Sequence, residues 1–152
     1  MKKFFLIVLT IVCAALITSC KNDPAVIPPY LQNPQLIGKW QLKSVEIKTE
    51  VSDIDDLPTD FYSDFTPNDY FEFKDNNAAM YSSSLIGKTY TGYYSTRADA
   101  TPQTLNFKSA NFNINFFIES ISSNELVLYQ TRSITDDNDV TTTVTSTYTY
   151  SH

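Results

Sequence analysis

Alternation of apolar and polar residues along most of the chain is the feature that most constrains its fold. Residues 111–118 alternate three asparagines with phenylalanine and isoleucine, and residues 140–150 carry a threonine at every second position from Thr141 to Thr149. Side chains of a β-strand point to opposite faces in turn, so a period of two predicts half-buried strands. β-Branched and aromatic residues, which suit pleated surfaces, dominate these runs. The pattern predicts an all-β protein.

Eight such runs follow one another, separated by turn signals rich in Asp, Asn, Ser and Pro. The predicted strands are residues 36–48, 70–74, 78–84, 88–95, 105–107, 112–118, 126–130 and 140–150. Consecutive short connections favour an eight-stranded up-and-down antiparallel β-barrel, because closing the sheet removes its exposed edges. A two-sheet sandwich fits the same pattern and stays open as an alternative. In the first run the apolar phase slips between Leu42 and Val45, which predicts a β-bulge.

Bulky side chains fill the predicted inward face. They are Trp40, Leu42, Phe71, Phe73, Met80, Tyr90, Tyr94, Phe107, Phe112, Ile114, Phe116, Leu126, Leu128, Val144 and Tyr148. Eight strands enclose a space that side chains fill or that holds one small ligand. The crowding favours a filled core, whereas the tyrosines, whose hydroxyls need partners, favour a cavity.

Residues 49–68, between the first two predicted strands, form the longest irregular segment. Leu57, Phe61 and Phe65 have helical spacing, and Pro58 restricts a helix to beginning near Leu57. We expect a short amphipathic helix that covers one end of the barrel, because long loops in compact domains are usually functional.

The N-terminus has the layout of a secretory signal peptide. Lys2 and Lys3 precede an apolar run over residues 4–17, which is too short for a comfortable membrane-spanning helix. The run ends in Ile17-Thr18-Ser19-Cys20, which resembles the lipobox of bacterial lipoproteins. The resemblance implies removal of residues 1–19 and lipid on Cys20, with Lys21 typical of sorting to the outer membrane, on its periplasmic or its external face. A chance cysteine in an ordinary secreted protein is the alternative.

Residues 20–35 carry four prolines and are interpreted as a tether, or alternatively as an ordered arm packed along the barrel; residues 36–152 form one domain. Loss of the two signal-peptide lysines changes the formal net charge from −6 to −8. Such a balance argues against nucleic acid and against a basic membrane-binding patch, so the lipid on Cys20 is the expected membrane contact. With Cys13 removed and Cys20 acylated, no disulfide is expected within the domain.

Residue types needed for common catalysis are scarce. His152 is the only histidine and stands at the end of the sequence, where fraying is expected, and no free thiol remains. Residues 53–56 and 136–139 are acidic, but neither has the spacing of a calcium loop, and Asp and Asn are common in turns. We therefore expect no enzyme activity, no metal site and no cofactor.

Leu36-Ile37-Gly38-Lys39-Trp40-Gln41-Leu42 resembles the Gly-x-Trp signature of lipocalins, and more closely the lipocalin-like domains of bacterial surface lipoproteins. Residues 69–75 and 125–128 are also similar to strands of such domains. The resemblance implies a barrel in which Trp40 closes one end beneath Arg132, the late arginine of this chain. The chain lacks the Thr-Asp-Tyr signature and the C-terminal helix of larger lipocalins.

Two hypotheses for function follow. The first is an anchored barrel that binds a small hydrophobic or amphiphilic molecule, with the 53–65 loop over its mouth. The predicted ligand-binding residues are Trp40, Phe73, Tyr90, Tyr94, Phe116, Leu128 and Tyr148. The alternative is a filled barrel whose acidic loops, with Asp53, Asp55 and Asp56, dock a protein partner in the cell envelope.

Overall fold

The computed structural model describes residues 33–54, 57–97 and 99–152. Predictions for the signal peptide, for Cys20, for nearly all of the tether, and for Asp55 and Asp56 lie outside these ranges. Within the described ranges, no helix combines the length and apolar character needed to cross a membrane.

In the part of the chain that the structure describes, a 3₁₀ turn, η2 (Pro34–Leu36), precedes nine strands. The strands are β1 (Gly38–Val51), β2 (Asp60–Tyr62), β3 (Tyr70–Phe73), β4 (Ala78–Ser83), β5 (Lys88–Arg97), β6 (Gln103–Ser109), β7 (Asn113–Ile121), β8 (Glu125–Thr135) and β9 (Thr141–Ser151).

The sheet closes on itself, as the alternation predicted. Strands β3 to β9 pair in chain order, β1 pairs with β3, and β1 also pairs with β9 over a long register from Gln41↔Ser151 to Val51↔Thr142. Strand β2 pairs with residues 45–47 of β1, beyond the residues that pair with β3, and is not needed to close the ring. The eight-stranded antiparallel barrel is therefore confirmed, and the sandwich alternative is excluded by the pairing of first and last strands.

The predicted bulge is also present. The register between β1 and β9 shifts between Leu42 and Ser44, within the interval where the apolar phase slips. An extra residue there bends the strand and increases its twist, which helps a short sheet to close.

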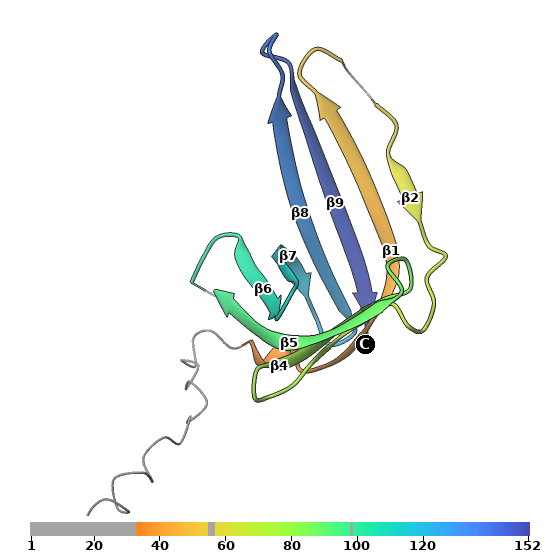
Figure 1. Cartoon of the computed structure of the whole chain (residues 1–152), viewed down its shortest axis with the longest axis vertical. Coiled ribbons are helices and arrows are strands. Elements are labelled where there is room, and N and C mark those ends of the chain that lie inside the picture. Colours follow the sequence, from red (N-terminus) through yellow and green to blue (C-terminus); the bar gives the residue numbers. More distant parts are fainter. Residues whose placement is uncertain (1–32, 55–56, 98) are drawn as a thin grey trace, which may run out of the picture.

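The barrel is uneven in height. Strands β1, β8 and β9 continue together well beyond strands β4 to β7 (Figure 1). We call this extension the wing: residues 47–51 of β1, 130–135 of β8 and 141–146 of β9. Pairing of β7 with β8 ends at Phe117↔Tyr129, and residues 131–135 of β8 are exposed. The sequence prediction ended this strand at Gln130, whereas β8 continues to Thr135.

The helix predicted in the long loop is wrong. Residues 60–62 form β2 instead, with Val45 opposite Tyr62 and Ile47 opposite Asp60. Part of the loop therefore extends the sheet beside β1 (Figure 1). Open backbone groups of β1 at that position supply hydrogen bonds that an isolated amphipathic turn would not gain.

The core lies inside the short part of the barrel. Its buried members are Leu36, Trp40, Phe71, Phe73, Ala79, Tyr94, Leu105, Phe107, Phe116, Ile118, Leu126, Leu128 and Tyr150. Met80, expected inside, pairs with Glu72 on the outward face, so Ala79 and Tyr81 face inward. A strand with apolar residues on both faces gives no clear phase, which explains the error.

Candidate functional site

The base of the barrel is plugged. Trp40 is fully buried, and its indole Nε1 donates a hydrogen bond to the backbone oxygen of Leu36 at 2.7 Å. Leu36, at the end of the 3₁₀ turn η2, is buried as well. A buried indole N–H needs an acceptor, and the turn supplies one while covering the ring. The indole and the turn together fill this end of the barrel.

The backbone angle of residue 38 and its contact with His152 at the base of the barrel both require a glycine. Its φ is +135°, and a Cβ placed on it would overlap the Nε2 atom of His152. The His152 ring also meets Trp40 edge-on, with ring centroids 4.8 Å apart. The backbone N–H of His152 donates to the oxygen of Asn124 at 3.1 Å, so the residue is held in place and is not frayed as predicted.

The prediction that Arg132 stacks on Trp40 is wrong. Arg132 lies opposite Val144 in the wing and is exposed. Because β8 begins at the base and runs upward, residue 132 is carried away from Trp40, and His152 at the end of β9 takes the place beside the indole.

Aromatic rings fill the middle of the barrel. The Phe71 ring lies at the centre, with the rings of Phe73, Tyr81, Phe107, Phe116 and Tyr150 at centroid distances of 4.7 to 5.9 Å. Close packing of this kind leaves no deep space above Trp40. Any ligand space must therefore lie nearer the other end.

Such a space exists where the barrel meets the wing. A pocket of about 770 Å³ begins at Leu42 of β1 and opens upward. It is lined by Leu42, Val45, Ile47, Phe61, Tyr62, Ser63, Asp64, Phe65, Asp69, Tyr81, Ser83, Ser84, Leu85, Ile86 and Tyr148. We call it the open-end pocket. Its size and mixed, mainly apolar lining are typical of sites for small molecules.

Exposed apolar side chains gather at its rim. The exposed fractions are 64% for Phe61, 52% for Tyr62, 91% for Leu85 and 45% for Ile86. Leu85 and Ile86 come from the β4–β5 turn, and Phe61 and Tyr62 from β2. Scattered exposed apolar residues are normal, but four around one hollow mark an interaction site.

Asp69 holds two sides of the pocket together. It is 2% exposed, and its carboxylate accepts hydrogen bonds from Ser84 N and Oγ, both at 2.6 Å, and from Thr66 N and Oγ1 at 2.8 and 2.9 Å. Burial by itself would raise the pKa of Asp69, but the hydrogen bonds from Ser84 and Thr66 outweigh it and lower the pKa. The residue thus stays ionised and joins the β4–β5 turn to the segment before β3.

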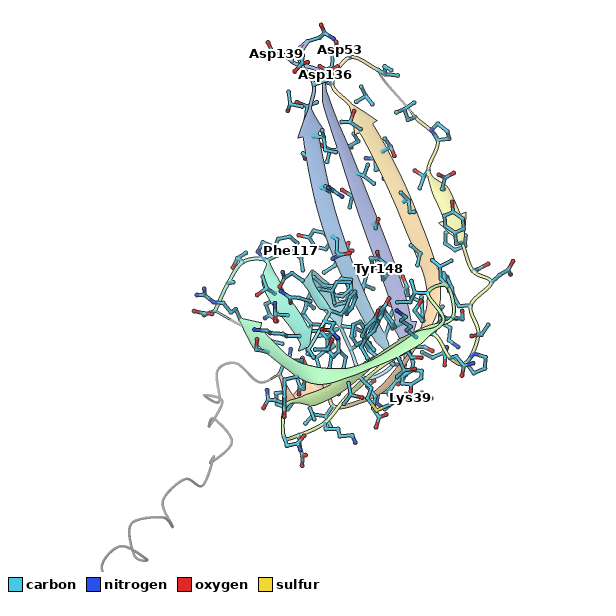
Figure 2. All side chains as sticks on the ribbon, in the orientation of Figure 1. Lys39, Asp53, Phe117, Asp136, Asp139 and Tyr148 are labelled. Atoms are coloured by element: carbon cyan, nitrogen blue, oxygen red, sulfur yellow. The ribbon has the colours of Figure 1, made fainter. Side chains whose placement is uncertain are left out.

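Two tyrosines form the floor of the pocket. Burial raises the pKa of both Tyr81 and Tyr148. The Tyr148 ring meets Phe116 edge-on at 5.4 Å, and its hydroxyl donates to Gln130 Oε1 at 3.4 Å. Figure 2 places Tyr148 at the junction of barrel and wing. These neutral phenols offer an apolar ring and a polar edge to a ligand.

The seven residues predicted to bind ligand are not brought together. Tyr148 lines the open-end pocket, whereas Trp40, Phe73, Tyr94, Phe116 and Leu128 are buried in the core. Tyr90 stacks on Phe112 at 4.5 Å. Ligand contact by these residues stays a prediction.

Sequence reasoning missed most of the lining. Leu85 and Ile86 are apolar residues in a turn, and this signal was available: an apolar pair between Ser84 and Gly87 has no core to enter. Phe61 and Tyr62 were assigned to a helix, so their position beside Val45 was not foreseen.

Two smaller hollows are weaker candidates than the open-end pocket, one because its lining is mainly polar and the other because it is shallow. One of about 310 Å³ lies among Asn68, Tyr70, Ser82, Lys88 and neighbouring residues, and one of about 440 Å³ lies on the outer face beside Ile118 and Tyr129. Among the described residues, no group of three or more His, Cys, Asp or Glu side chains is placed to hold a metal ion. The open-end pocket is therefore the candidate site.

A small up-and-down barrel that is filled at its base and open at an apolar mouth is the architecture of barrels that bind one small ligand. A family model described as a lipocalin-like domain matches residues 36–128, more than half of the chain. The chain belongs to the lipocalin-like domain family, as the Gly-x-Trp resemblance implied. The family generally comprises binding proteins and not enzymes. Comparisons with curated proteins and with solved structures found no match.

Proposed function

We propose that this protein is a bacterial lipoprotein that binds a small hydrophobic or amphiphilic molecule in the open-end pocket without catalysis. The observation that carries the proposal is the hollow itself, about 770 Å³ above a filled and plugged base and rimmed by exposed Phe61, Tyr62, Leu85 and Ile86. Leaving such side chains in water costs roughly 25 cal/mol per Å², which a bound apolar molecule would recover.

Fluorescence titration tests the pocket. The chain from Lys21 onward contains every described strand and the core they enclose, so circular dichroism should report a β-rich fold. We expect the uncharged probe N-phenyl-1-naphthylamine to bind saturably with a fluorescence increase.

Two exposed tyrosines provide a matched pair of variants. Tyr62 lines the pocket and Tyr93 lies on β5 outside it, with exposed fractions of 52% and 67%. Tyr62→Ser should weaken probe binding about tenfold, since an aromatic side chain contributes on the order of 1.5–3 kcal/mol when covered. Tyr93→Ser should bind as the parent does; equal affinity of all three proteins would contradict this site.

The anchor is proposed from the lipobox-like segment before Cys20 and from Lys21, which favours the outer membrane. Two or more acyl chains hold a protein stably at a bilayer. Mass spectrometry of the mature N-terminus from bacterial membranes should find an acylated Cys20. Cys20→Ser should release the protein from the membrane or leave it unprocessed, and an unmodified cysteine in the parent would refute the anchor.

The alternative function, docking of an envelope protein, draws support from the wing. Asp53, Asp136 and Asp139 lie together at its tip (Figure 2). Recovery of a partner from membranes should fall when Asp53 and Asp136 are both replaced by Lys. Equal recovery with parent and variant would count against docking through this tip.

A further inference from the structure

The charged side chains that line the open-end pocket are both acidic. They are Asp64 and Asp69, and the described lining residues include no lysine, arginine or histidine. Lys88, which follows the β4–β5 turn, lines the adjoining polar hollow, which shares Ser83 and Ser84 with the pocket. The ion pairs among the described residues, Lys48–Glu50 and Arg97–Asp99, involve neither pocket carboxylate.

The two carboxylates differ in availability. Asp69 is committed to Ser84 and Thr66 and contributes a fixed negative charge at the pocket wall. Asp64 is exposed, in the loop after β2, and no hydrogen bond of its side chain is seen within the described ranges. A ligand group that enters the mouth therefore meets one free carboxylate and the field of a second.

The remaining lining is rich in aromatic rings: Phe61, Tyr62, Phe65, Tyr81 and Tyr148. The negative faces of such rings attract cations, with a gain of roughly 0.5–2 kcal/mol per well-placed contact. Elsewhere the same chain uses this interaction, since Lys39 Nζ lies 4.0 Å from the centroid of the Tyr70 ring.

An anionic head group would find the opposite conditions. A fatty-acid carboxylate needs a cation or several free N–H donors to offset its desolvation, and the lining side chains offer hydroxyls beside two like charges. From these observations, and resting on the proposed function above, we infer that the open-end pocket selects lipophilic cations, meaning amines or quaternary ammonium groups that carry an apolar chain or ring.

Three ligands with one decyl chain separate charge from apolar burial: decyltrimethylammonium, decanol and decanoate, each below its micellar concentration. Each competes with N-phenyl-1-naphthylamine on the chain from Lys21 onward. We expect decyltrimethylammonium to bind at least about tenfold more tightly than decanoate, with decanol between them. Decanoate binding as tightly as the ammonium compound would overturn this inference and leave the proposed function standing. Failure of the uncharged probe and of all three ligands would instead overturn the proposed function.

Two neighbouring carboxylates give a matched control. Asp64 lines the pocket, whereas Asp60 is exposed on β2 and does not. Asp64→Asn should reduce the preference for ammonium over alcohol while decanol affinity stays the same, and Asp60→Asn should keep the preference. An unchanged preference in Asp64→Asn would overturn the role of that carboxylate in selecting a cation.

Discussion

At the residue scale, Gly38, Trp40 and His152 form one unit at the base. The positive φ of Gly38 would strain any residue that carries a Cβ, and the ring of His152 occupies the space where that Cβ would lie. Trp40 lies edge-on to the same ring. The glycine of the Gly-x-Trp segment is thus required by backbone conformation and by a close approach, two separate physical reasons.

A double-mutant cycle separates those reasons. Gly38→Ala should destabilise the fold by about 1–3 kcal/mol through backbone strain and overlap. His152→Ala should cost about 0.5–1.5 kcal/mol through loss of the edge-on contact. The double variant should lose less than the sum, because removing the ring relieves the overlap but not the strain. Urea unfolding measures all four proteins, and strict additivity would mean that the ring does not crowd Gly38.

Asp69 sets an acid limit on stability. Its folded-state pKa lies below that of the unfolded chain, so its contribution is complete above the unfolded pKa and is lost as the pH falls through the folded pKa. Asp69→Asn should destabilise the protein by about 1–3 kcal/mol at neutral pH.

The gap between parent and Asp69→Asn should shrink toward about pH 3, because protonation weakens the same hydrogen bonds in the parent. Urea unfolding at both pH values checks this, with Asp64→Asn, whose side chain is exposed, as the variant expected to unfold like the parent. A gap independent of pH would show that the charge of Asp69 is not what Ser84 and Thr66 stabilise.

At the scale of elements, the wing differs from the barrel although the same three strands build both. Thr131, Ser133 and Thr135 face Thr145, Thr143 and Thr141 across β8 and β9, with hydroxyl pairs 2.9 to 3.2 Å apart. Such pairs favour the register, but within the described ranges no second layer covers residues 131–135 of β8, which are exposed.

Hydrogen exchange should reveal this difference. Amides of residues 131–135 should exchange faster than those of residues 103–109 in β6 and 126–129 in β8, because wing hydrogen bonds lie next to water. Mass spectrometry of exchanged peptides resolves the two parts. Equal protection would mean that the wing is covered in solution, as docking of a partner would require.

At the scale of the whole molecule, closure of β1 onto β9 encloses the aromatic core and sets an alkaline limit. Burial raises the pKa of Tyr81, Tyr94 and Tyr148, and most strongly that of Tyr150, which is buried among other rings. A tyrosine with a raised folded-state pKa stabilises the fold fully below its unfolded pKa. That stability is lost as the pH rises through the folded value.

Ultraviolet titration of the native protein should therefore show a late transition that comes from the buried phenols. Tyr94 and Tyr150 should ionise only as the barrel unfolds, above the value of about 10 that is ordinary for a phenol. In concentrated guanidinium all should ionise together. A single transition in the native protein would contradict a water-free core.

Much of the fold was predictable because alternation reports which face of a strand is buried. The bulge near Leu42 and the inward positions of Phe71 and Phe73 are consequences of that period. The candidate site was less predictable. Phe61 has a helical spacing with Leu57 and Phe65, and only the open edge of β1 decided that residues 60–62 form a strand.

By itself, the sequence determined an antiparallel all-β fold with an aromatic interior, since the periodicity and the turns show which side chains are buried. The pairing of β1 with β9 in the tertiary structure decided for the barrel and against the sandwich. The tertiary structure decided how that interior divides between core and pocket, because ring packing around Phe71 depends on rotamers and register that no local pattern encodes. It also decided which late residue meets Trp40: strand direction carries Arg132 into the wing and brings His152 to the base.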